Sequence, residues 1–305
     1  MGTVTILARQ ILQMFVLVGL GFLLFRGNKI NLEVSKGLAN ILIYLSLPAM
    51  IIKGFLVERT SENILTLAIS SGVAAALLLL SMVLSRLLFK KDPIASFAGA
   101  FSNPGFFGFP LIIALLGSDA VFCVAGFVAL LNVGQWTYGV SVLTGQPILQ
   151  GLKPKKLIKA PFVIAILIGL VLFFTQLQLP PLVSGCLDTV AGLNTPLAMF
   201  TIGVYLAQVN LRQMLRNKKV YLVTAIRLAV IPLLSMLLLA LLPAQLKDMK
   251  MALLLVAACP VGANVAVYSQ LHNQDYGYAV ECVVVSTFLT VLTIPAIAAL
   301  GEIVF

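Results

Sequence analysis

The stretch Ser102-Asn-Pro-Gly-Phe-Phe-Gly-Phe-Pro110 interrupts an apolar run that extends from residue 94 to residue 116. Its two prolines remove backbone donors and disturb the carbonyls four residues earlier, and its two glycines permit the backbone to leave helical geometry. A second stretch, Cys259-Pro-Val-Gly-Ala-Asn264, interrupts the run from 249 to 272 in the same way. Such stretches predict helices that unwind within a membrane, where free backbone groups must line a cavity rather than face lipid.

The rest of the chain is too apolar for a soluble globular domain. Of its 305 residues, 61% are hydrophobic and 10% are charged, whereas soluble domains are closer to one half and one quarter. Apolar runs of this length predict membrane-spanning helices, which satisfy their own backbone groups in lipid. We predict an all-α integral membrane protein with ten spans, at 5–25, 34–56, 63–89, 94–116, 119–145, 157–178, 188–208, 220–242, 249–272 and 276–300.

The chain contains 20 Lys and Arg but only 10 Asp and Glu, and most of the Lys and Arg residues lie in alternate loops between the spans. One side carries fourteen cations: Arg26, Lys29, Lys36, Arg86, Lys90, Lys91, Lys153, Lys155, Lys156, Lys159, Arg212, Arg216, Lys218 and Lys219. The other side carries five: Arg9, Lys53, Arg59, Lys247 and Lys250. Because cytoplasmic loops are rich in Lys and Arg, both termini are expected outside. Topology and anionic lipid headgroups of the bilayer account for the net charge of +10, so no nucleic-acid partner is expected.

The two halves of the chain share short motifs in the same order. Gly19-Leu20 matches Gly169-Leu170, Pro48 matches Pro196, residues 79–82 match 233–236, and residues 120–124 resemble 279–283, with offsets of 148 to 159 residues. Because five is an odd number of spans, the second copy enters the membrane from the opposite side and is inverted relative to the first. Inverted repeats are a common plan of secondary transporters. We therefore predict one repeat at 1–145, a cytoplasmic linker at 146–156 and an inverted repeat at 157–305. A duplication that only stabilises the fold is the alternative.

The two interrupted spans, the fourth and the ninth, occupy equivalent places in the repeats, since Pro104 and Pro260 are offset by 156 residues. Where the unwound segments cross, two half-helix N-termini would present free N–H groups and partial positive charge to a small carboxylate. The candidate substrate-binding residues at the crossing are Asn103, Pro104, Gly105, Gly108, Pro110, Pro260, Gly262 and Asn264. Ser46 and Asn194, beside prolines in the second and seventh spans, either complete the site or only satisfy carbonyls that proline frees. Proline kinks that only shape packing are the alternative for the breaks themselves.

Two charged residues, Arg227 and Glu281, lie inside expected spans at comparable depth. Because a lone charge in the membrane is costly, three interpretations remain: a structural ion pair, an Arg227 that attracts an anionic substrate with Glu281 as its counter-ion, or snorkelling to the surface. Glu281 could also relay a proton. Asn132, Gln135 and Tyr138 of the fifth span either line the transport path or hydrogen-bond between helices. Because no metal-ligand spacing, cofactor motif or catalytic motif is found, we expect no metal, no cofactor and no enzyme activity.

Taken together, the fourth-span motif from Asn103 to Pro110 and the ninth-span motif from Pro260 to Asn264, followed by Tyr268 and Gln270, resemble the auxin efflux carrier family. That family includes the plant PIN auxin exporters and bacterial carriers of malate- or malonate-like acids. The resemblance covers essentially the whole chain. It implies a fold like the bile-acid symporters and sodium/proton antiporters, with scaffold spans 1, 2, 6 and 7 beside transport spans 3–5 and 8–10, and with broken spans 4 and 9 crossing. It also implies that Asn103, Pro110, Pro260 and Asn264 lie at the substrate site.

The expected function is therefore secondary transport of a small organic anion, such as malate, malonate or an auxin-like acid, by alternating access. A sodium- or proton-coupled symporter of the bile-acid-symporter type and a non-transporting membrane sensor are the alternatives. The family resemblance predicts a multi-pass protein of a bacterial cytoplasmic (inner) membrane. The sequence leaves open whether the protein forms a homodimer.

Overall fold

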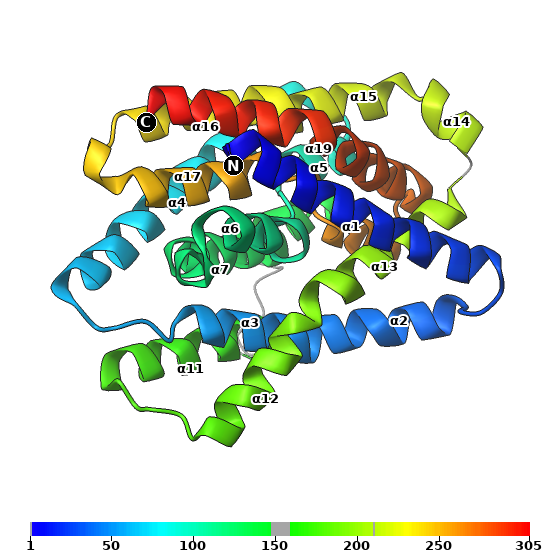
Figure 1. Ribbon diagram of the computed structural model, residues 1–305. Coiled ribbons are helices and arrows are strands. Elements are labelled where there is room, and N and C mark those ends of the chain that lie inside the picture. Colours follow the sequence, from blue (N-terminus) through cyan, green and yellow to red (C-terminus); the bar gives the residue numbers. More distant parts are fainter. Residues whose placement is uncertain (1, 148–158, 210) are drawn as a thin grey trace.

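The computed structural model describes residues 2–147, 159–209 and 211–305 (Figure 1). Within these ranges the regular secondary structure is helical, apart from one isolated bridge. With η for π- and 3₁₀-helical segments, the elements are α1 Thr3–Arg26, α2 Leu32–Ile41, η1 Leu42–Ser46, α3 Leu47–Gly54, α4 Ser61–Leu88, α5 Pro93–Ala100, η2 Pro104–Gly108, α6 Phe109–Leu116, η3 Ser118–Val124, α7 Ala125–Gly134, η4 Gln135–Gly139, α8 Val140–Thr144, α11 Pro161–Thr175, α12 Pro181–Gly192, α13 Asn194–Gln208, α14 Leu211–Arg216, α15 Lys218–Ala225, η5 Ile226–Val230, α16 Ile231–Ala240, η6 Ala244–Leu246, α17 Lys247–Ala258, α18 Asn264–Leu271 and α19 Tyr276–Val304. The expected linker at 146–156 lies outside the described residues except for its first two.

Seven helical runs in the described parts of the chain are long and apolar enough to cross a membrane: Thr3–Arg26, Leu32–Gly54, Ser61–Leu88, Ser118–Thr144, Pro181–Gln208, Lys218–Ala240 and Tyr276–Val304. Two shorter apolar helices are Pro104–Leu116 and Pro161–Thr175. The expected fourth and ninth spans are absent from the seven because each is divided into two helices. The protein is a helical membrane protein of several spans, as its composition predicts.

Proline positions explain three of the π-helical segments. Pro48, Pro110 and Pro232 each lie two residues after the end of such a segment, namely η1, η2 and η5. Because proline has no N–H and its ring clashes with the carbonyl four residues earlier, the chain widens locally from the α-helical to the π-helical hydrogen-bond pattern.

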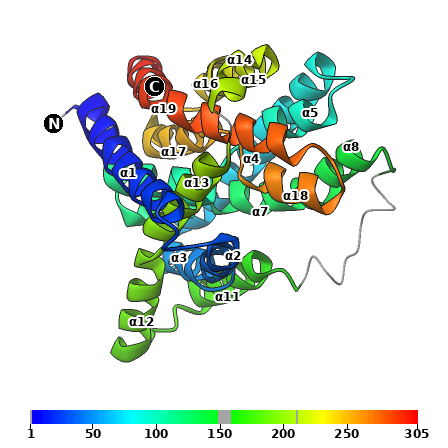
Figure 2. The ribbon, with the colours of Figure 1, turned by 90° about the vertical axis from the view of Figure 1, so that its right-hand side faces the viewer.

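One group of helices consists of α1, the α2–η1–α3 run, α11, α12 and α13. α1 packs along α13, and α3 packs against both α11 and α12; Figures 1 and 2 show α2, α3, α11 and α12 together at the lower side of the molecule. Two glycines bring the backbones of α1 and α13 close. A Cβ on Gly21 would lie 2.6 Å from the Phe200 carbonyl oxygen, and one on Gly203 would overlap the carbonyl oxygen of Val18.

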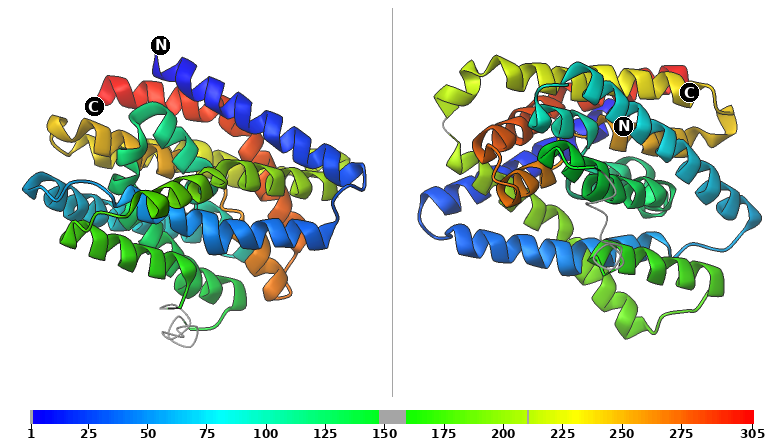
Figure 3. Two further views of the ribbon diagram at one scale, coloured as in Figure 1. Left: turned by 60° about the horizontal axis from the view of Figure 1, so that its bottom comes forward. Right: turned by 180° about the vertical axis from the view of Figure 1, so that it is seen from behind.

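The second group contains α4 to α8 and α15 to α19. In it, α4 packs against α5 and α7, while α19 packs against α15, α17 and α18. The groups meet where α1 contacts α6 and α19. The two chain ends lie on the same side of the bundle, where the Thr3 hydroxyl contacts the Glu302 carboxylate (Figure 3).

Candidate functional site

Two helices of the second group are interrupted by short non-helical segments. After α5, Phe101 has extended backbone (φ −117°, ψ 118°), and helical structure resumes at Pro104. After α17, Cys259 has extended backbone (φ −60°, ψ 152°), and α18 begins at Asn264. The breaks lie where proline and glycine predict them.

The two interrupted segments pair with each other. The Gly262 N–H donates to the Phe101 carbonyl oxygen at 3.0 Å, and Ser102 forms an antiparallel bridge with Val261. The Val261 N–H donates to the Ser286 hydroxyl oxygen of α19 at 3.0 Å. The N–H groups of Val261 and Gly262, which the helix break releases, are therefore satisfied by α19 and by the partner segment.

Glycine is required at the closest approach of the two segments. A Cβ on Gly262 would lie 2.8 Å from the carbonyl oxygen of Ser102 and 3.3 Å from that of Phe101. On the other segment, a Cβ on Gly108 would lie 3.1 Å from Cys259 Sγ. A side chain at Gly262 would push two backbones apart, and backbone atoms have no rotamer by which to move away.

A small cavity of about 40 Å³ lies beside the crossing. It is lined by Leu47, Ser102, Asn103, Pro104, Gly105, Phe106, Val128, Leu131, Asn132, Gln135, Gly262, Ala263 and Asn264. A single water needs roughly 10–15 Å³, so the cavity has room for about three waters or one carboxylate group.

Asn103 presents a free donor at this cavity. Its side chain is only 6% exposed, and its Oδ1 accepts from the Phe106 N–H at 3.4 Å, which caps η2. Its Nδ2, like the Ser102 hydroxyl, is buried without a partner among the described residues. Because an unpaired buried donor costs about 1–3 kcal/mol, these groups favour occupation of the cavity by an acceptor.

The fifth expected span supplies another wall of the cavity, with Val128, Leu131, Asn132 and Gln135. Asn264 Nδ2 donates to Gln135 Oε1 at 2.8 Å, and the Gln135 side chain is only 1% exposed. Gln135 thus both lines the cavity and hydrogen-bonds between helices. Tyr138 does not line the cavity, and its hydroxyl donates to the Met82 carbonyl oxygen at 3.2 Å. Asn132 and Gln135 are three residues apart on one helix face, and this spacing is a sequence signal that could predict the wall.

Two helices begin at the cavity. Pro104 opens the helical run that continues to Leu116, and Asn264 opens α18. Each helix N-terminus carries roughly half a positive charge. Some first-turn N–H groups already have acceptors, since Phe106 donates to Asn103 Oδ1 and Val265 to the Gly262 carbonyl oxygen. The two positive helix ends and the free amide of Asn103 together form a site suited to a small anion.

Residues 6–298 match the family described as "Membrane transport protein". The chain belongs to this family. It is the auxin efflux carrier family that the two motifs resemble. The transporter is also similar to a protein of Rhizobium meliloti (strain 1021) named "Putative malonate transporter", with 28% identity over 302 residues that cover 93% of this chain and 92% of that protein. Both comparisons point to a transporter rather than an enzyme.

The predicted site residues of the transporter fall into two sets. Those that line the cavity are Asn103, Pro104, Gly105, Gly262 and Asn264; those that are buried nearby without lining it are Gly108, Pro110, Pro260, Ser46 and Asn194. Asn194 still contacts the site from α13, because its Nδ2 donates to the Gly105 carbonyl oxygen at 2.8 Å. The Ser46 hydroxyl is buried and has no partner among the described residues.

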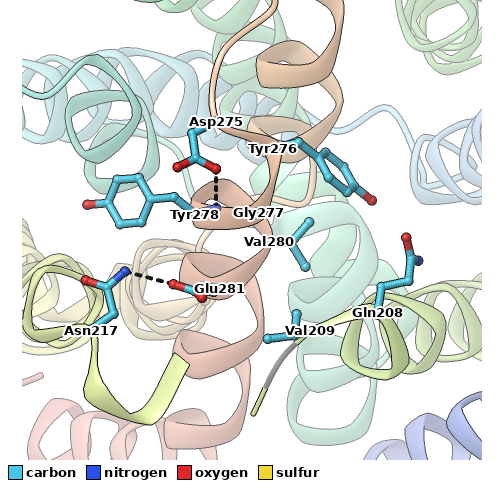
Figure 4. A pocket seen from close by; sticks show the side chains of 9 residues that line it. All are labelled: Gln208, Val209, Asn217, Asp275, Tyr276, Gly277, Tyr278, Val280 and Glu281. Carbon is cyan, nitrogen blue, oxygen red and sulfur yellow. Dashed lines mark hydrogen bonds between the residues drawn. The ribbon is translucent and has the colours of Figure 1, made fainter. Parts of the chain in front are cut away.

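Arg227 and Glu281 have separate partners in the transporter. Arg227 is 1% exposed and donates to the Gly99 carbonyl oxygen at 3.1 Å and to that of Ala257. Glu281 Oε2 accepts from Asn217 Nδ2 at 2.8 Å (Figure 4). Within the described part of the chain no ion pair joins Arg227 to Glu281, so the structural ion pair is not formed in this structure. Snorkelling does not describe Arg227 either, because its side chain is buried.

A larger cavity of about 360 Å³ lies at the start of α19 (Figure 4). It is lined by Gln208, Val209, Asn217, Asp275, Tyr276, Gly277, Tyr278, Val280 and Glu281. Two of these described side chains are carboxylates and none is Lys or Arg, so the cavity disfavours an anion. The crossing is therefore the better candidate for an anionic substrate despite its smaller volume.

Proposed function

We propose that this transporter is a secondary carrier of a small organic anion and that the carboxylate of the substrate binds in the cavity at the crossing. The observation that carries the proposal is the buried, unpartnered Nδ2 of Asn103 in a cavity where two helices begin. An incoming carboxylate would accept from this amide, and the positive ends of the two helices would stabilise its charge.

The proposed architecture has ten spans in two inverted five-span repeats. Motifs that recur along the sequence support it, and so does the antiparallel pairing of Ser102 with Val261. Repeats related by an axis in the membrane plane run in opposite directions through the membrane, so their equivalent segments meet antiparallel. The proposed scaffold, with spans 1, 2, 6 and 7, corresponds to the packed group of α1, α2–α3, α11 and α12–α13.

Alternating access would proceed by movement of the transport spans, 3–5 and 8–10, against this scaffold. Two scaffold residues reach the crossing: Leu47 lines the cavity, and Asn194 donates to the Gly105 carbonyl oxygen. A sliding motion would exchange these two contacts while the paired segments stay together. The positive-inside pattern supports termini outside the cytoplasmic membrane, which labelling of single cysteines introduced near Thr3 and Lys219 would test.

Malonate is the first substrate to test because of the name of the relative. The cavity has room for one carboxylate, so the second carboxylate of such an acid would extend toward the scaffold or require the site to widen. Malate, an indole acid and an amino acid serve as comparison substrates.

The experiment measures uptake of radiolabelled malonate into proteoliposomes that contain the purified protein. Asn103→Ala and Asn264→Ala are each expected to reduce the initial rate at least tenfold while the protein folds normally. Asn31→Ala is the matched control, because Asn31 also caps a helix through its side chain but is exposed. Wild-type rates in both crossing variants would contradict the assignment of the site. Binding without flux for every acid would favour the sensor.

A further inference from the structure

Arg227 is a buried charge without an acidic partner. It lies in η5, five residues before Pro232, and its side chain is 1% exposed. Within the described residues no carboxylate lies within 4.0 Å of its guanidinium. An uncompensated charge at membrane depth is strongly unfavourable, so other groups must stabilise it.

Backbone carbonyls at the ends of two helices supply this stabilisation. One terminal nitrogen of Arg227 donates to the Gly99 carbonyl oxygen at 3.1 Å and lies 3.5 Å from that of Ala100. The other terminal nitrogen donates to the Ala257 carbonyl oxygen. Ala100 is the last residue of α5, and Ala257 is the penultimate residue of α17. One guanidinium therefore bridges the C-terminal ends of both half-helices that lead into the crossing.

The charge of Arg227 balances the partial negative charges of the two helix C-termini that it binds. The last carbonyls of a helix have no intrahelical partner, and a helix C-terminus carries roughly half a negative charge. Two such ends amount to about one negative charge, which the single positive charge of Arg227 neutralises. The positive helix starts at Pro104 and Asn264 follow the paired segments along the chain and line the crossing cavity, where an anion would meet them.

In transporters with broken helices, unwound carbonyls and half-helix C-terminal ends are the groups that coordinate a transported Na⁺ or proton. Here a guanidinium attached to the chain binds those groups. We propose that Arg227 is a permanent cation at the place where a coupling cation would otherwise bind, so that the crossing holds its anion without Na⁺. This inference rests on the proposed function, because it takes the crossing as the substrate site.

The first test compares malonate uptake by wild-type protein with Na⁺ present and with N-methyl-D-glucamine in its place on both sides of the membrane. The rates are expected to agree within twofold. A loss of more than tenfold without Na⁺ would overturn the inference. Absence of uptake under both conditions, for every acid tested, would instead defeat the proposed function.

The second test removes the charge. Arg227→Ala leaves a space lined by carbonyl oxygens, and its KM for malonate is expected to rise at least tenfold. Added methylguanidinium or Na⁺ is expected to restore part of the uptake and to raise the thermal midpoint of this variant by several degrees. The matched control is Arg86→Ala, which removes an exposed arginine that also donates to a carbonyl, that of Lys90. That control is expected to show neither a change in KM nor a response to the added cations.

If Arg227 only holds the helices in place, Arg227→Ala should lose uptake and thermal stability, and no added cation should restore either. That result would overturn the inference. The thermal midpoint needs no substrate, so this readout separates the role of Arg227 from the proposed function. Should Arg227→Ala fail to fold, Arg227→Lys decides the question, because it keeps the charge. It is expected to transport without Na⁺, and a Na⁺ requirement in this variant would contradict the proposal.

Discussion

Replacement of Gly262 by alanine tests most directly whether the two interrupted segments approach each other as closely as the structure shows. The added Cβ would lie 2.8 Å from the Ser102 carbonyl oxygen, whereas ordinary contacts begin at 3.4 Å. The φ angle of Gly262 is not positive, so alanine can adopt the backbone conformation and only the lack of space opposes it. The two segments must therefore separate by about 0.6 Å, which is the shortfall in van der Waals distance.

The energetic cost follows from the hydrogen bond that holds the segments together. The Gly262 nitrogen lies 3.0 Å from the Phe101 carbonyl oxygen, to which it donates. A separation of about 0.6 Å lengthens this bond beyond the usual limit of about 3.2 Å. Loss of a buried hydrogen bond that leaves its groups unpaired costs about 1–3 kcal/mol. A central value of about 2 kcal/mol corresponds to a roughly 30-fold smaller population of the intact crossing.

The assay measures initial rates of malonate uptake together with the thermal midpoint of the purified protein. Gly262→Ala is expected to lower the uptake rate at subsaturating malonate by roughly 30-fold, in line with the cost above. Gly72→Ala is the matched control, because a Cβ there meets no atom within 4 Å in the middle of α4. It is expected to transport normally and to be as stable as wild type or more so. A Gly262→Ala protein with wild-type rates and midpoint would show that the segments do not approach each other this closely.

Three further substitutions separate the parts of the proposal. Asn194→Ala removes the hydrogen bond from the scaffold to the crossing, and we expect a changed maximal rate with a KM within about threefold of wild type, measured by uptake over a range of malonate concentrations. Glu281→Gln keeps an acceptor for Asn217 and lies away from the crossing cavity, so uptake and its response to an imposed pH gradient are expected to be unchanged; a lost pH response would favour a proton relay. Gly203→Ala places a Cβ against the Val18 carbonyl of α1, and overpacking of this kind costs about 1–3 kcal/mol, so the thermal midpoint should fall whether or not substrate is present.

The sequence by itself determines the class of protein and the positions of the helix breaks. Apolar runs predict the helices because lipid leaves no other partner for the backbone. The breaks follow from Pro104, Gly105, Pro260 and Gly262, because a missing N–H or Cβ acts on the backbone at that position whatever surrounds it. Asn103 is recognisable for a similar reason, since a short amide before a proline is a helix cap.

Only the tertiary structure decides which side chains meet at the site. Gln135 lies 129 residues before its partner Asn264, and Arg227 lies 128 residues after the Gly99 carbonyl that it binds. The sequence places Arg227 and Glu281 at similar depth in the membrane, but their partners depend on how each helix is rotated about its axis. That rotation is set by the packing of several helices at once, such as the close contact of α1 with α13 at Gly21. Local chemistry therefore fixes where the chain breaks, whereas long-range packing fixes what the broken ends bind.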